Sequence, residues 1–263
     1  MFNFCSLYSG SSGNCSFIET NHTKILIDAG HSAKKISEAL QRNSINITDI
    51  DAILVTHEHS DHVKSLGTLS SKYNIPIFAN KETWNSMPDQ AKKVSAECKK
   101  IFEVDSDFEI KDLKIHSFSI PHDAANPCGF SFYNSNKKIS IATDIGHITN
   151  NILENLTKSN FALLEANYDP NILKYSRYPY SLKQRITGPN GHLSNTESGN
   201  LISTLMKSGL NSTMLGHLSK ENNFPELAYK TVVEELIYNH YDESAISIKV
   251  AKRDMPSPII HIA

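Results

Sequence analysis

The sequence has 263 residues, of which 39% are hydrophobic and 21% are charged, and its formal net charge is -2. These values are ordinary for a folded globular protein and exclude a collagen-like, low-complexity or disordered chain. The near-neutral charge gives no overall attraction to a polyanion, so any contact with nucleic acid must come from a local cluster of Lys and Arg. We expect a single domain over residues 1–263.

The cysteines and the N-terminus indicate the compartment. The four cysteines are scattered, with no C-x-x-C pair, in a chain too long to need disulfide bridges for its stability. The N-terminal segment lacks a basic start, and no apolar run approaches the length that spans a bilayer. We therefore expect reduced thiols in a cytoplasmic protein that is neither exported nor bound to a membrane.

The first third of the chain alternates short β-type runs with tight polar turns. This pattern predicts strands over 3–8, 15–19 and 24–28 that form antiparallel hairpins. An amphipathic helix is expected over 32–43, where Ile36 and Leu40 lie four residues apart. A further strand is expected over 52–56, and it ends directly at a run rich in histidine.

The rest of the chain mixes helices and strands. Helices are expected near 63–73, 81–87, after 149, and near 196–208 and 225–239, and strands near 77–79, 108–110, 113–120, 129–133, 138–143, 161–165 and 213–215. Both kinds of element occur in both halves, which favours two sheets flanked by helices over a regular βαβ series. No linker is visible. The polar stretch 87–100 is the best candidate for a domain boundary, although it also fits a helix between two halves of one domain.

The densest cluster of metal-binding side chains is the hexapeptide HEHSDH, residues 57–62. His57 and His59 occupy alternate positions and can point at one metal ion, while Asp61 and His62 can reach a second ion beside it. Imidazole together with carboxylate suits Zn, Mn or Fe. A polar helix cap with surface histidines is the alternative, but three histidines and an aspartate within six residues after a buried strand favour a metal site.

The pattern T-H-x-H-x-D-H in this segment resembles the signature of the metallo-β-lactamase superfamily. The resemblance implies an α+β fold, a four-layer αββα sandwich with two metal ions at one edge of its sheets. It also implies that the other ligands follow later strands: His122 for the first ion, Asp144 as a bridge between the ions, and His217 for the second. Asp28 is implied to orient the hexapeptide by hydrogen bonds.

Two ions about 3.5–4 Å apart lower the pKa of a shared water toward ~7 and neutralise charge on substrate oxygens. A hydroxide at neutral pH is therefore the predicted nucleophile. By analogy with the superfamily, Asp61 both binds metal and accepts a hydrogen bond from that hydroxide.

The superfamily includes hydrolases of β-lactams, thioesters and lactones as well as nucleases, so its fold does not choose the substrate. Glu165, at the end of strand 161–165, and His192, in GHLSN, resemble the Glu and His of the phosphodiesterase branch. The resemblance implies that His192 protonates the departing oxygen and that Glu165 orients it, and a general acid can contribute ~10²–10⁴-fold. The alternative is a structural histidine before a helix that Ser194 or Asn195 caps.

Four basic residues and three tyrosines lie between these positions, in the segment 174–185. They could grip phosphates and stack on unpaired bases, although a solvated surface turn is the ordinary explanation. Ser11, Ser12 and Asn14 of the GSSGNC segment could also offer polar groups to a substrate, and a turn-forming role is an equally open explanation for them. The expected substrate contacts are Ser11, Ser12, Asn14, Arg177, Lys183, Arg185 and Ser194.

Several blocks narrow the resemblance. GSSGNC, LVTHEHSDH, PHDAANPCGF, LLEAN, GHLSN and LGHLSKENNFPELA together resemble the YycJ/WalJ family over nearly the whole chain. This family is related to tRNase Z and the β-CASP nucleases, although the chain is too short for a β-CASP insertion between Asp144 and His217. The resemblance implies a 5′-to-3′ exonuclease that acts on DNA with two divalent metal ions, while RNA stays open as a further substrate. Two hypotheses stay open beside it: a small-molecule hydrolase of cyclic phosphodiesters, thioesters or lactones, and a non-catalytic metal-containing nucleic-acid-binding protein.

Overall fold

The first of two sheets is built mainly from the N-terminal part of the chain. The computed structural model describes residues 1–262, and within that range this sheet has seven strands. Neighbours are antiparallel from the C-terminal edge strand to β3 and parallel from β3 onward. The spatial order is β14 (Ile260–His261), β1 (Asn3–Tyr8), β2 (Cys15–Glu19), β3 (Lys24–Ile27), β4 (Ala52–Leu54), β5 (Ile77–Ala79) and β6 (Lys99–Ile101).

The second sheet, also seven-stranded within the described range, continues along the chain. Its first four strands are antiparallel neighbours and its last four are parallel neighbours. The spatial order is β7 (Asp107–Ile110), β8 (Leu113–Ser119), β9 (Cys128–Asn134), β10 (Lys137–Ala142), β11 (Phe161–Glu165), β12 (Ser212–Gly216) and β13 (Ser247–Val250).

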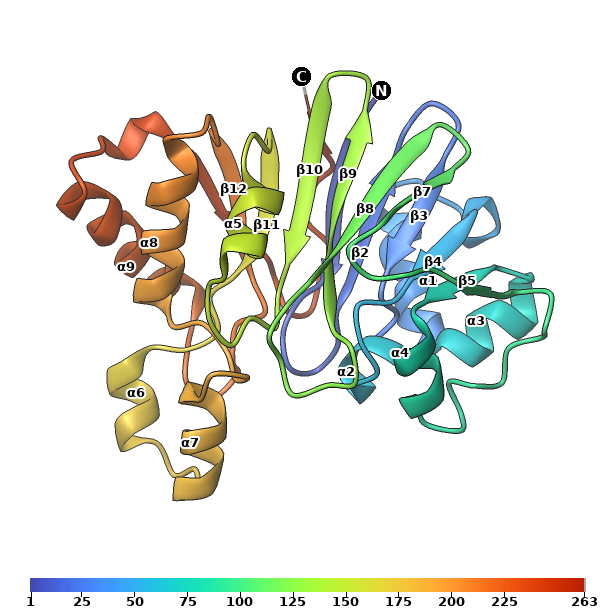
Figure 1. The fold of residues 1–263 in the computed structure, drawn as a ribbon, viewed down its shortest axis with the longest axis horizontal. Coiled ribbons are helices and arrows are strands. Elements are labelled where there is room, and N and C mark those ends of the chain that lie inside the picture. Colours follow the sequence, from blue (N-terminus) through green and yellow to red (C-terminus); the bar gives the residue numbers. More distant parts are fainter. Residues whose placement is uncertain (263) are drawn as a thin grey trace.

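Helices cover the outer faces of both sheets (Figure 1). On the first sheet these are α1 (Ala33–Arg42), α3 (Leu66–Tyr73) and α4 (Lys81–Ser86); on the second they are α5 (Asn150–Leu156), α8 (Asn195–Met206) and α9 (Pro225–Tyr238). The expected four-layer αββα arrangement is therefore confirmed. The remaining short elements are η1 (Ile47–Asp49), α2 (Ser60–Val63), α6 (Pro170–Tyr175), α7 (Tyr180–Thr187) and η2 (Glu243–Ala245).

The central core lies between the two sheets. Phe4 of β1 packs against Phe161 of β11 with tilted rings whose centroids are 4.7 Å apart, and Phe130 and Phe132 of β9 belong to the same buried layer. Residues that alternate with these face the outer helices, so most strands are buried on both faces. Each of these fully buried phenylalanines contributes about 1.5–3 kcal/mol relative to exposure.

Most sequence-based elements are confirmed within one or two residues. Ser32 and Asn43, the bounds expected for the first helix, are the cap residues of α1. The helix expected over 63–73 is instead split into α2 and α3. The stretch 87–100 holds turns before β6 and no helix. The pattern did not predict β6, α6, α7, β13 or β14.

Candidate metal centre and active site

The hexapeptide follows β4, and Asp28 fixes its position from the neighbouring strand. One oxygen of Asp28 accepts from the amide of Thr56 at 2.9 Å, and the other lies 2.7 Å from His62 Nδ1. Asp28 is 3% exposed and adopts a left-handed φ of 63°. A side chain bonded in this way presents Nε2 of His62 to the centre, as the sequence led us to expect.

The GSSGN turn packs directly on the hexapeptide. Gly30, which follows β3, approaches the hexapeptide at the same place, so closely that a Cβ atom there would lie 1.6 Å from the carbonyl oxygen of Asp61. Only glycine fits at this position. Asn14 donates its amide to the same oxygen at 2.8 Å, and its Nδ2 lies 3.3 Å from Asp61 Oδ2 and 3.0 Å from His62 Nε2. We expected Asn14 to contact substrate. In the structure its side chain is buried and contacts two of the predicted metal ligands.

The structure brings together the side chains that we expected to bind metal. His57, His59 and His122 form one group, and Asp61, His62 and His217 form another, with the potential ligand atoms of each group within 4.8 Å of one another. Asp144 lies between the groups: its Oδ1 is 3.7 Å from His122 Nε2 and 3.4 Å from His217 Nε2. These residues come from four separate segments of the chain.

The buried donor atoms of this centre fit divalent metal ions. Among residues 1–262, Nε2 of His57, His122 and His217 and Oδ2 of Asp144 are buried and have no hydrogen-bond partner. Leaving a buried polar atom unpaired costs about 1–3 kcal/mol. In His122, Nδ1 bonds the carbonyl of Gly191 at 3.1 Å, so the lone pair is on Nε2. His59 bonds a carbonyl through Nε2, which leaves its Nδ1 free for the cluster.

The electrostatics of the centre also favour a cation. Burial lowers the pKa of His57 well below its usual range, and the neighbouring histidines lower it further. Burial also opposes a charge on His62, but the carboxylates around it, Asp28 foremost, raise its pKa to about 9. The pKa of His217 is likewise raised well above its usual range, because the carboxylates around it, Asp144 foremost, outweigh the effect of burial. Buried carboxylates therefore attract positive charge to this position, which protons or metal ions can supply.

Backbone strain accompanies the centre. Asp144 and His217 have φ values of 60° and 54°, and each follows a buried strand. A left-handed conformation costs a residue with a side chain of order 1–3 kcal/mol and persists where the surrounding structure imposes it. Ser9 is part of that structure, because its Oγ accepts the amide of His217 at 2.8 Å.

Glu165 connects one group of the centre to His192. Its Oε1 lies 2.8 Å from His192 Nδ1 and 2.9 Å from His217 Nδ1, while its Oε2 accepts two backbone amides. Glu165 is fully buried, which alone would raise its pKa. The two histidines outweigh this and hold the pKa of the carboxyl well below its usual range, so it remains ionised.

A cavity of about 220 Å³ opens over these groups. Its floor holds residues of the centre, and one wall is α7, which contributes Leu182, Arg185 and Ile186. In Figure 1, α6 and α7 lie at the lower left, below α8. A small cluster of buried side chains, Tyr168, Leu173 and Ile186, packs this pair against the sandwich.

Some of the expected substrate contacts lie at the cavity or on the surface near it, and others bond within the protein. Arg185 and Ser11 line the cavity, and Arg177 lines an adjoining hollow with Tyr175 and Tyr178, while Ser12 lies exposed in its turn. Lys183 donates to the carbonyls of Lys174 and Ser176 and so joins α7 to α6.

Ser194, which we expected to contact substrate, does not line the cavity. It is 4% exposed and forms a capping box with Glu197 at the start of α8. The alternative considered for His192 named Ser194 or Asn195 as the cap of the following helix; Ser194 is that cap, while His192 lines the cavity.

The sequence did not single out Asn167 and Ser219, which line the cavity, or Asp123, which lies beside it. Asn167 donates from Nδ2 to the carbonyl of His217 at 2.8 Å and lines the cavity with Ser219. Asp123, next to His122, bonds Arg185 at the cavity wall. Asn167 lies two residues after Glu165 in LLEAN, a signal that could have been used, whereas the pairing of Asp123 with Arg185 has none.

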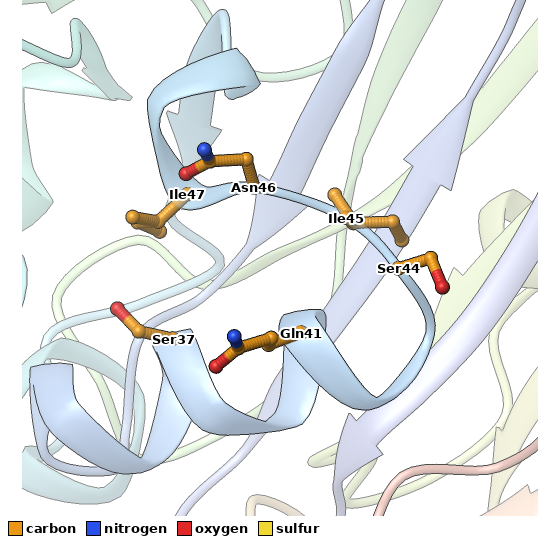
Figure 2. Close-up of a pocket in the computed structure, with 6 residues that line it drawn as sticks. All are labelled: Ser37, Gln41, Ser44, Ile45, Asn46 and Ile47. Atoms are coloured by element: carbon orange, nitrogen blue, oxygen red, sulfur yellow. The ribbon is translucent and has the colours of Figure 1, made fainter.

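A second hollow, of about 460 Å³, lies between the end of α1 and η1 (Figure 2). Figure 2 shows only amide, hydroxyl and aliphatic side chains around it. None of its lining residues is ionisable, so it lacks the acids, bases and ligands that hydrolysis requires. The residues around it are Ser37, Gln41, Ser44, Ile45, Asn46 and Ile47.

Comparison with known proteins agrees with the geometry of the centre. The sequence profile described as the metallo-beta-lactamase superfamily matches residues 8–193. The chain belongs to the metallo-β-lactamase superfamily. This superfamily member is 37% identical over 233 residues to exodeoxyribonuclease YycJ of Bacillus anthracis, a match that covers 89% of the chain and 88% of YycJ.

Exodeoxyribonuclease WalJ of Streptococcus pneumoniae serotype 2 is 39% identical to it over 237 residues, with 89% and 88% covered. The expected membership of the YycJ/WalJ family is thus confirmed. Among solved structures, the metallo-β-lactamase fold protein YhfI of Bacillus subtilis matches with a TM-score of 0.71 at 13% identity and covers 98% of this chain and 99% of YhfI, which shows the fold. No helix among residues 1–262 has the length and apolar character needed to cross a membrane.

Proposed function

We propose that this chain is a metal-dependent phosphodiesterase that degrades DNA, acting as a 5′-to-3′ exonuclease. The observation that carries the proposal is the contact between His192, which lines the cavity beside the metal-binding groups, and the buried Glu165, whose Oε1 lies 2.8 Å from His192 Nδ1. Hydrolysis of a phosphodiester expels a poor alkoxide leaving group, so it benefits from a proton donor at this position. The exodeoxyribonuclease names of YycJ and WalJ support DNA as the substrate.

The proposed ligands are divided between two ions. His57, His59 and His122 would hold one, Asp61, His62 and His217 the other, and Asp144 would contact both. Two divalent ions bound here supply an activated water and neutralise charge on the phosphate. Nitrogen and oxygen donors suit Zn, Mn and Fe alike.

The chain's own residues orient the substrate and move the proton. Glu165 holds Nδ1 of His192, so Nε2 is the ring nitrogen that delivers a proton to the departing oxygen. Asp61 accepts a hydrogen bond from the attacking water and so orients it toward phosphorus. Because Glu165 also bonds His217, one buried carboxylate aligns the proton donor with the metal-binding groups.

The test is a substrate panel given to the purified protein loaded with Zn, Mn or Fe. The panel holds 5′-labelled and 3′-labelled single-stranded and double-stranded DNA, the same sequence as RNA, a chromogenic phosphodiester and a thioester. We expect mononucleotides to be released stepwise from the 5′ end of DNA. Hydrolysis of a small compound with DNA left intact would overturn the nuclease, and binding of DNA without cleavage would favour the non-catalytic protein.

A further inference from the structure

The carboxylate of Asp123 lies between the first histidine group and α7. Its Oδ1 is 3.3 Å from His122 Nε2 and 4.0 Å from His59 Nε2, and its Oδ2 accepts a hydrogen bond from Nε of Arg185. The side chain of Asp123 is 32% exposed and that of Arg185 55%. The proposed chemistry assigns no role to this ion pair, although Arg185 lines the cavity.

The backbone around Asp123 is held on three sides. Its amide donates to the carbonyl of Asn190 at 3.1 Å, and its own carbonyl lies 3.2 Å from His59 Nε2. Two residues further on, the amide of Ala125 donates to Glu58 at 2.8 Å. Asp123 is therefore a fixed acceptor, while Arg185 reaches it with a long side chain from a helix of eight residues.

The guanidinium is engaged at one of its donor groups. Arg185 bonds Asp123 through Nε, and among the described residues neither of its Nη groups has a hydrogen-bond partner. Two free NH₂ groups in one plane match two oxygens of a phosphate. An arginine without a fixed acceptor would lose side-chain entropy on reaching such a geometry.

The geometry points to Asp123 as a positioning residue that holds the guanidinium of Arg185 with its Nη groups toward a substrate phosphate over the first histidine group. This inference rests on the proposed function and deepens it, because it names the group that recognises the phosphate. Asp123 acts through Arg185 and touches no reacting atom. A phosphate bound here lies beside the ligands of one proposed ion.

The test compares two neutral substitutions, Asp123→Asn and Asp123→Ala. Both remove the carboxylate charge, but only asparagine keeps an oxygen that can accept from Nε of Arg185. Each is made with Arg185 intact and with Arg185→Ala, all in the metal-loaded His192→Ala protein to suppress turnover. Binding of a fluorescent single-stranded DNA oligonucleotide is measured by anisotropy, with thermal melting and metal content as checks on folding and on the centre.

With Arg185 intact, we expect the D123N protein to bind the oligonucleotide roughly threefold to tenfold more tightly than the D123A protein, which is the effect of one hydrogen bond. In the R185A background this difference should disappear. Equal affinities with Arg185 present, or a difference that persists without it, would overturn the inference. If the parent protein binds no DNA at all, the proposed function fails and the inference with it; binding without this dependence on Arg185 overturns the inference alone.

Discussion

The two sides of the cavity are built by opposite means. The metal-binding side is buried and over-determined: Glu165 is fully buried and accepts four hydrogen bonds, and Asp28, Asp144 and His217 are held in left-handed conformations. The side formed by α6 and α7 rests on one small cluster of buried side chains, and its Tyr175 and Tyr180 are 79% and 76% exposed. We infer that the sandwich holds the residues proposed for the chemistry rigidly, while the appended helix pair can set substrate preference.

The largest effect is expected from Asp144→Ala, which removes the carboxylate between the two groups of ligands. We expect lower metal content and a loss of about 10³-fold in kcat, because the charge stabilisation that the proposed ions would supply is worth several kcal/mol. Elemental analysis and a DNA cleavage assay measure both quantities. Asp89→Ala, at an exposed position, is the matched control and should change neither. Full activity in D144A would remove the metal centre from the account.

His192→Ala should retain both ions and lose about 10²–10⁴-fold in kcat, because we propose that His192 donates a proton and is not a metal ligand. His147→Ala is the control, since this exposed imidazole contacts only the carbonyl of Pro189 among the described residues. Unchanged turnover in H192A would reject its acid role.

Glu165→Gln should lower kcat as His192→Ala does and also weaken metal binding about 10–100-fold, because Glu165 also orients His217.

Removal of the ions by a chelator should destabilise the metal-binding side of the cavity and leave the helix pair α6 and α7 unchanged. Binding at a thousandfold excess over Kd stabilises the folded protein by about 4 kcal/mol. For a chain of this size that corresponds to a fall of roughly 10 °C in Tm on chelation. Amide hydrogen exchange should rise in the loops 56–62 and 121–126 and stay unchanged in α6 and α7. A uniform rise over the whole chain would contradict the distinction drawn between them.

Metal affinity should rise between about pH 6.5 and 9. The raised pKa of His62, about 9 without metal, means that its proton stabilises the metal-free fold fully below pH 6.5 and that this contribution is lost as the pH passes 9. A metal ion must displace that proton, so binding releases protons and tightens as the pH rises. Calorimetric titration in two buffers of different ionisation enthalpy measures the release. Binding that takes up protons would show that the sign is wrong.

The smallest effects belong to the basic residues of the helix pair. Lys174→Ala and Arg177→Ala should each raise KM for DNA about threefold and leave kcat unchanged, since each exposed cation neutralises at most one phosphate. The slope of log K against log salt should fall by about 0.7 for each substitution. Lys207→Ala, at the end of α8, is the control. A loss of kcat in either variant would place the helix pair in the chemistry itself.

This contrast also explains how far the sequence could be interpreted. Buried strands that end in His, Asp or Glu carry a periodic signal, so the sandwich and the residues gathered at its edge could be predicted together. The elements β6, β13 and β14 are short and lie at sheet edges, and α6 and α7 are short and mostly exposed. Their patterns were too weak to separate from turns.

Individual contacts of the polar residues were harder to predict than the elements. Lys183 and Ser194 carry groups suited to a phosphate, yet both use them inside the protein, one on backbone carbonyls and the other in a helix cap. The pairing of Asp123 with Arg185 joins residues 62 positions apart. Such contacts depend on how the loops are placed in space, which local pattern does not encode.

A metal titration of the purified chain, in which elemental analysis and cleavage of end-labelled DNA are followed together, tests whether two bound ions are required for nuclease activity. We expect two ions per chain at saturation and DNA cleavage that reaches its maximum as the second ion binds. Saturation at one ion or none, or intact DNA at full occupancy, would contradict this expectation.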